Sequence, residues 1–168
     1  MQGSLLAKLF EINYGALFRN LDGITHEESF VRPQPAGNCL NWVLGHIVAT
    51  RNRLLPLLRV EPIWPRELAM RYSGRDEADW SRETAVHLDT IKTDLARSQQ
   101  QLLISLENLS DKDLSTPAYD GRPLSEVIGF FQFHESYHSG QIALLRRIIG
   151  KPGVIKPPRP SAPVTTLH

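Results

Sequence analysis

The chain has 168 residues, a net charge of +1, a hydrophobic fraction of 41% and a charged fraction of 22%. These values are ordinary for one soluble domain with a proper core, and the length is short for two such domains. A net charge near zero, with no basic run, argues against a nucleic-acid or membrane partner. The single cysteine, Cys39, excludes an internal disulfide and fits a reducing cytoplasm.

The N-terminal segment does not resemble a signal peptide, because Lys8 and Glu11 interrupt the apolar run that such a peptide needs. No stretch approaches the roughly 18 consecutive apolar residues of a membrane span. We therefore expect a cytoplasmic protein without a membrane partner.

Four segments show the apolar periodicity of helices. They are residues 4–21, 39–58, 83–109 and 124–149. In the third segment, leucines recur every seven residues from Leu88 to Leu109, which is typical of a seam between bundled helices. Shorter helical pieces are predicted at 25–30, 65–72 and 110–113. No segment has the pattern of a strand.

Two stretches connect or follow these helices without a clear pattern of their own. Residues 60–80 form a long connection with Pro62 and Pro65, and connections of this length often cover a functional site. Residues 151–168 contain five prolines and are expected to be an extended tail. The sequence thus predicts an all-α, antiparallel four-helix bundle at 1–150, followed by a Pro-rich tail at 151–168.

Two histidines four residues apart, His134 and His138, lie in the last predicted helix. Side chains at this spacing share one face, about 6 Å apart along the helix axis. Seven-residue repeats with Val127 and Phe131 place both histidines on the stripe that faces the core. Two such imidazoles can bind one metal ion if a third ligand comes from elsewhere, and His46 in NWVLGHI is the best candidate.

Buried histidines need partners, and two interpretations supply them. The rings can donate hydrogen bonds to carboxylates or backbone carbonyls, or they can bind a metal ion in the bundle core. Three neutral imidazoles would leave a coordination position for water or substrate, which is typical of a catalytic rather than a structural site. Such a donor set suits zinc, nickel, iron or copper.

Three polar residues lie close to these histidines on the predicted helices. Arg53, one heptad after the histidine of the second helix, either holds an anionic substrate group, or extends its side chain into solvent or pairs with an acidic residue. Gln141, one heptad after the first histidine of the pair, is the preferred candidate for orienting a ligand. Glu135 is either an acceptor for an imidazole N–H or a charge on the helix surface.

Further residues near the histidines have weaker signals. Trp42 is expected beside the pocket, and Tyr137 either lines the pocket or fills a neighbouring stripe. Cys39 is interpreted as a small core residue, and His87 as a weak candidate for an additional ligand. No residue is assigned a catalytic role, because no carboxylate is clearly placed as a general base.

The two histidine segments, NWVLGHI at 41–47 and HESYHSGQIALLRR at 134–147, together resemble the DinB family, also called DinB-like or YfiT-like proteins. The segment DGRPL at 120–124 is similar to the start of the family's last helix, and the order of segments agrees as far as Gly150. The resemblance implies a four-helix bundle with a long crossover, often dimeric. It also implies a divalent metal, usually zinc or nickel, held by His46, His134 and His138.

The resemblance also implies a set of candidate activities. Characterised members include transferases and isomerases that use low-molecular-weight bacterial thiols such as mycothiol or bacillithiol, and others are described as hydrolases. An open metal site suits both chemistries, because it lowers the pKa of a bound thiol or water. The leading hypothesis is a metal-dependent thiol S-transferase with a small-molecule substrate, acting as a homodimer. The alternatives are a metal-dependent hydrolase and a non-catalytic metal-binding bundle that acts in the stress response.

Overall fold

The computed structural model describes residues 2–74 and 80–154, and the regular elements within these ranges are helices, with one isolated bridge between Pro117 and Pro123. The long helices are α1 (Gln2–Leu21), α2 (Leu40–Leu54), α4 (Leu88–Glu107) and α6 (Leu124–Ile148). Short helices in the connections are η1 (Glu28–Phe30), η2 (Leu55–Leu58), α3 (Arg66–Arg71), η3 (Arg82–Thr84) and α5 (Asp111–Ser115). The all-α prediction is confirmed. Within the same ranges, no helix has the length and apolarity of a membrane span.

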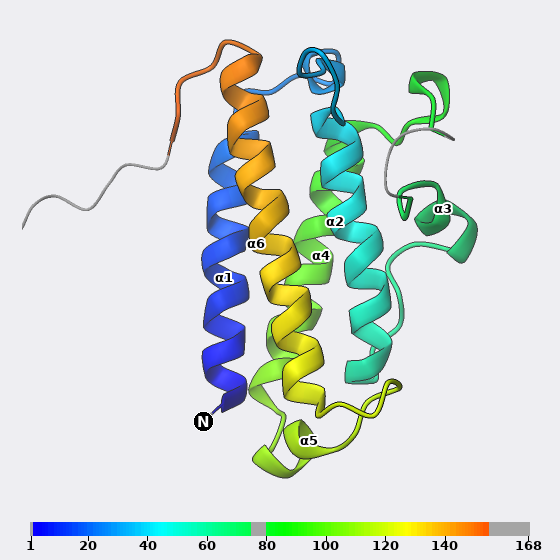
Figure 1. Ribbon diagram of the computed structural model, residues 1–168, viewed down its shortest axis with the longest axis vertical. Coiled ribbons are helices and arrows are strands. Elements are labelled where there is room, and N and C mark those ends of the chain that lie inside the picture. The colour runs from blue at the N-terminus through cyan, green and yellow to red at the C-terminus, as the bar shows by residue number, and fades with distance from the viewer. Residues whose placement is uncertain (1, 75–79, 155–168) are drawn as a thin grey trace, which may run out of the picture.

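The four long helices lie side by side along one axis (Figure 1). Helices α1 and α6 run in one direction, and α2 and α4 run in the other. Each of α1 and α2 packs against both α4 and α6, so that α1 and α2 lie diagonally opposite each other. Because α2 and α4 are parallel, the chain returns along the bundle between them, and this crossover carries α3. The long connection expected from the sequence is therefore the crossover. Of the predicted tail, residues 155–168 lie outside the described residues.

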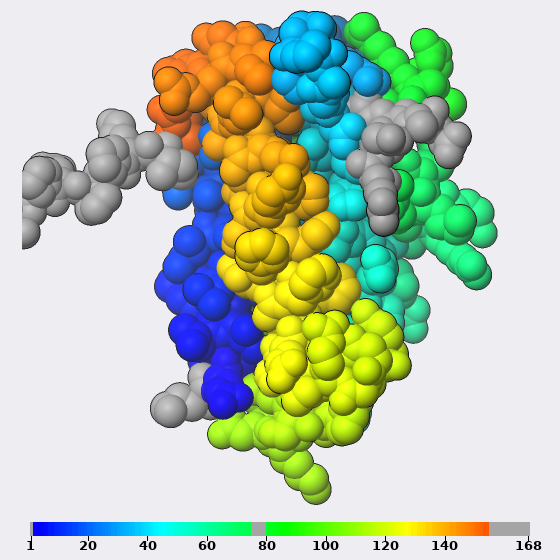
Figure 2. Space-filling model, in the orientation of Figure 1, coloured from blue at the N-terminus to red at the C-terminus, as the bar shows by residue number. Residues whose placement is uncertain are grey.

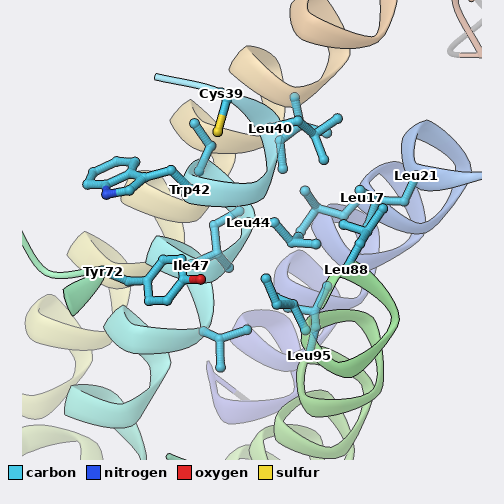
Figure 3. Packing of buried hydrophobic residues seen from close by; sticks show 14 of the residues in the cluster. Leu17, Leu21, Cys39, Leu40, Trp42, Leu44, Ile47, Tyr72, Leu88 and Leu95 are labelled. Atoms are coloured by element: carbon cyan, nitrogen blue, oxygen red, sulfur yellow. The ribbon is translucent and has the colours of Figure 1, made fainter. Parts of the chain in front are cut away.

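Apolar side chains from α1, α2 and α4 fill the interior of one half of the bundle (Figure 3). The leucine repeat of α4 contributes Leu88 and Leu95 to this half and Leu102 to the other half, and all three are buried. A second cluster, centred on Phe10 and Phe131, fills the other half. In the space-filling view, α6 forms a ridge between α1 and α2 on the face shown (Figure 2). Helix α6 therefore packs against both α1 and α2.

Helix α4 begins at Leu88, not at residue 83 as the sequence predicts. The preceding residue Val86 is held by two hydrogen bonds to other parts of the chain. Its N–H donates to the hydroxyl of Tyr72 at 2.8 Å, and its carbonyl accepts from Nδ2 of Asn41 at 3.0 Å. These bonds compete with the helical ones, and His87 then caps the helix with its side chain.

A buried ion pair joins three of the long helices. Arg51 on α2 and Glu135 on α6 are 2% and 3% exposed, and the guanidinium donates to both carboxylate oxygens at 2.7 and 2.9 Å. The remaining donors reach α4, at Oγ of Ser98, Oε1 of Gln99 and the carbonyl of Leu95. Because every donor of the guanidinium is used, this pair fixes the register of α2 against α6.

Removing one partner of this pair should strongly destabilise the fold. Arg51→Met leaves the carboxylate of Glu135 buried without a cation, and we expect the free energy of unfolding to fall by about 3–5 kcal/mol. The double variant Arg51→Met/Glu135→Leu removes both charges and should recover most of that loss. Urea unfolding followed by circular dichroism measures both changes.

The matched control is Lys8→Met, because Lys8 forms an exposed pair with Glu11. Its expected effect is below about 1 kcal/mol. A loss for Arg51→Met no larger than that of the control would contradict the structural role of the buried pair.

Candidate metal centre

Three imidazole rings meet between α2 and α6. His46 comes from α2, and His134 and His138 come from successive turns of α6. The Nε2 atom of His134 lies 3.2 Å from Nε2 of His46 and 3.1 Å from Nε2 of His138. The three candidate ligand atoms lie within 4.8 Å of one another. The structure thus brings together the three histidines that the sequence singled out.

Hydrogen bonds at the far side of two rings fix where their protons lie. Nδ1 of His46 is 2.6 Å from the backbone carbonyl oxygen of Tyr72, and Nδ1 of His138 is 2.7 Å from Oε1 of Gln141. A carbonyl oxygen can only accept, so each Nδ1 carries the hydrogen of its neutral ring. The Nε2 atoms of both rings therefore present lone pairs to the cluster.

Protein hydrogen bonds alone cannot satisfy this arrangement. If His134 carries its proton on Nε2, it can donate to His46 or to His138, and the other lone pair faces it without a partner. Its Nδ1 atom is buried and has no hydrogen-bond partner among the described residues, so no neighbour fixes its tautomer. A divalent cation bound by the three Nε2 atoms would use all three lone pairs. The residues present therefore fit a metal ion.

Burial keeps the three rings neutral. It lowers the pKa of His134 and of His138 to about 4, and it lowers the pKa of His46 below its ordinary value. For His134 the two neighbouring imidazoles lower the pKa further, and the positive charge of Arg53 lowers the pKa of both His46 and His134. At neutral pH the rings are consequently in the form that binds metal ions.

The crossover supports the cluster through Tyr72, which is fully buried. Its ring packs on Gly45, where an added Cβ would lie 2.3 Å from two ring carbons. The glycine before His46 thus lets the crossover come close enough for its carbonyl to accept from that histidine. Trp42 stacks on the ring of His46, with ring centroids 4.9 Å apart and an interplanar angle of 10°.

Sequence reasoning missed the roles of Tyr72 and Gly45. A glycine inside a helical apolar pattern, directly before a candidate ligand, was the available signal. The tyrosine had no comparable signal, because it lies in a connection whose path the pattern does not define.

The remaining candidate residues lie at different distances from the cluster. Gln141 contacts it directly, as described above, whereas Tyr137 is 59% exposed and meets the ring of His138 edge-on at 5.3 Å. Arg53 is exposed, one heptad after the histidine on α2. Cys39 and His87 lie outside the cluster, at the N-caps of α2 and α4.

Both alternatives expected for Glu135 are wrong. It neither accepts from an imidazole nor lies on the helix surface, because its carboxylate pairs with Arg51 in the core. Its neighbours at the heptad positions, Ile128 and Ile142, are fully buried, so this stripe of α6 faces inward.

The sequence matches the DinB superfamily over residues 9–142, and the chain belongs to this superfamily. No curated protein matches it. A conserved protein from Enterococcus faecalis of known crystal structure is similar, with a TM-score of 0.67 and 19% identity, covering 88% of this chain and 96% of that one. The colibactin self-resistance protein ClbS, crystallised in complex with a dsDNA, has a TM-score of 0.62 and 17% identity, covering 84% and 94%. Both share the fold described above.

The ClbS complex corrects the expectation that this chain has no nucleic-acid partner. That expectation relied on the net charge of +1 and on the absence of a basic run in the sequence. A protein of the same fold is crystallised with dsDNA, so the fold is compatible with nucleic-acid binding. Net charge fails as a criterion here because duplex DNA contacts a local surface, whose charge can differ from that of the whole chain.

Gly45→Ala tests the contact between α2 and the crossover. The added methyl group would overlap the ring of Tyr72, and we expect the free energy of unfolding to fall by about 1–3 kcal/mol. Gly129→Ala on α6 is the matched control, since an added Cβ there meets no atom within 4 Å. The control should gain up to about 1 kcal/mol from the higher helix propensity of alanine. Equal stabilities of the two variants in urea unfolding would rule out the close contact.

Proposed function

We propose that His46, His134 and His138 hold a catalytic divalent metal ion, and that the protein is a metal-dependent transferase using a low-molecular-weight thiol. The observation that carries this proposal is the convergence of three imidazole nitrogens. Too few protons lie between these nitrogens for each lone pair to accept a hydrogen bond. Structural zinc sites have four protein ligands, whereas three histidines are grouped among the described residues. His46 and His134 are partly exposed, so a substrate can approach the cluster.

A divalent ion in such a site lowers the pKa of a thiol or a water molecule that reaches it. The residues of the chain provide orientation and shielding. Gln141 and the carbonyl of Tyr72 hold two of the rings, and Trp42 covers one face of His46. In the transfer, the thiol sulfur forms a bond to an electrophilic carbon, the leaving group departs with the bonding electrons, and the thiol proton passes to solvent.

The positions of the carboxylates favour thiol transfer over hydrolysis. No hydrogen bond joins a carboxylate to any of the three rings among the described residues, and Glu135, beside His134 in sequence, is bound to Arg51. Hydrolysis would require deprotonation of a metal-bound water, whose pKa stays near neutrality, whereas a metal-bound thiol would be deprotonated outright. A site without a general base is therefore better suited to a thiol. Zinc and nickel are the first candidates for the ion, and iron and copper also accept imidazole.

Metal content tests the premise that all three candidate functions share. Protein purified without a histidine tag should contain about one divalent ion per chain by elemental analysis, and His134→Ala should lose it because only two ligands remain. His87→Asn is the matched control, since it removes an imidazole outside the cluster and keeps a side chain that caps α4. Equal metal content in wild type and His134→Ala would contradict the metal centre.

A panel of thiols then tests the reaction itself. Metal-loaded protein is incubated with 2-mercaptoethanol, cysteine or mercaptosuccinate and with monobromobimane, which becomes fluorescent when a thiol displaces its bromide. We expect conjugation above the uncatalysed rate that a chelator abolishes and added metal restores.

The panel also includes ester substrates and duplex DNA, because hydrolysis and nucleic-acid binding are the other outcomes. Metal-dependent ester hydrolysis without conjugation would favour the hydrolase. Retained metal without either reaction would contradict transfer and favour a non-catalytic bundle.

A further inference from the structure

A cavity of about 290 Å³ lies between α2 and the crossover. The side chains of Ala49 and Arg53 line it from α2, and Arg66, Met70 and Ser73 line it from the crossover. Figure 1 shows α3 beside α2, and the two helices are in contact. The cavity is thus bounded by the same crossover that supports the histidine cluster.

We propose that Arg53 and Arg66 form an anion-binding subsite next to the metal centre, which holds a carboxylate or phosphate group of the substrate. This inference rests on the proposed function and names the class of substrate that the site accepts: a thiol, or its electrophilic partner, that carries an oxyanion.

The charges that line the cavity are of one sign. Neither Arg53 nor Arg66 makes a hydrogen bond or ion pair within the described residues, and no acidic residue of those ranges lines the cavity. By contrast, Arg51, two residues earlier, uses all of its donors in the core. Two guanidiniums on one cavity attract an anion, and their planar donors match the two oxygens of a carboxylate or phosphate.

The two other polar side chains of the cavity wall, Ser73 and Asn52, are already used. The hydroxyl of Ser73 donates to the carbonyl of Ala69 at 2.6 Å. Asn52 donates to the carbonyl of Trp64 at 2.7 Å and accepts from the N–H groups of Ile63 and Trp64. It therefore fixes the crossover against α2 and does not compete for a ligand. The two arginines remain as the groups that can recognise a charge.

The spacing of residues along α2 relates the cavity to the histidine cluster. Arg53 follows His46 by seven residues, which places it on the same face of α2 about 10 Å further along the axis. Ala49 lies between them on that face and lines the cavity with only a methyl group. A substrate whose reacting atom lies at the histidine cluster can therefore extend its charged end toward the arginines.

A matched pair of thiols tests the subsite. Mercaptosuccinate carries two carboxylates and 2-mercaptoethanol none, and both are conjugated to monobromobimane by metal-loaded protein. We expect wild type to prefer mercaptosuccinate in kcat/KM, and Arg53→Gln and Arg66→Gln to reduce this preference about tenfold, mainly through KM. Arg53→Lys should keep part of it. Arg97→Gln, at an exposed position on α4, is the control and should retain the wild-type preference.

Calorimetric titration with succinate and with inorganic phosphate provides a readout that requires no turnover. We expect one of these anions to bind both metal-loaded and metal-free protein, with an affinity about tenfold lower in Arg53→Gln. The anion that binds more tightly identifies the oxyanion class, carboxylate or phosphate.

The possible outcomes distinguish a failure of the proposed subsite from a failure of the proposed function. Anion binding that depends on Arg53, without conjugation of any thiol, would support the subsite and contradict transfer. Conjugation without charge preference, with no binding of succinate or phosphate, would overturn the subsite and leave transfer intact. Binding of a DNA duplex that depends on Arg53, when neither small anion binds, would also overturn the subsite as proposed.

Discussion

The register of α2 against α6 is the constraint on which the rest of the structure depends. The buried pair of Arg51 and Glu135 fixes this register, because it leaves no free donor on the guanidinium and ties both helices to α4. Glu135 directly follows His134, and Arg51 lies little more than one turn after His46. A slip of one turn would separate the imidazoles by about 5 Å and leave two opposite charges unpaired in the core. The ion pair and the histidine cluster are thus parts of one arrangement.

The parallel direction of α2 and α4 has a second consequence for the site. The chain must return along the bundle, and the returning segment supplies the carbonyl of Tyr72 that orients His46. The bundle alone would leave that Nδ1 without an acceptor. Gly45 makes this approach possible, and the cavity lined by Arg53 and Arg66 is bounded by the same segment. The crossover therefore acts as a wall of the site as well as a connection.

Much of the fold and of the histidine cluster could be predicted from the sequence, because both follow repeating patterns of residues. The spacing of apolar residues defined the long helices, and heptad counting placed His134 and His138 on the inward stripe. The apolar spacing mispredicted the start of α4, because tertiary hydrogen bonds to Val86 override helix propensity there. The pair of Arg51 and Glu135 was missed although each residue occupies a gap in an apolar stripe, because a charge at such a position is usually assigned to the surface.

X-ray absorption spectroscopy of the purified protein at the edge of its bound metal tests the central claim most directly. Three imidazole nitrogens are predicted to coordinate the ion, at about 2.0–2.1 Å if it is zinc, with the remaining coordination filled by a light atom such as a water oxygen. A spectrum dominated by sulfur at about 2.3 Å, or one that requires fewer than three imidazoles, would contradict a centre built from His46, His134 and His138.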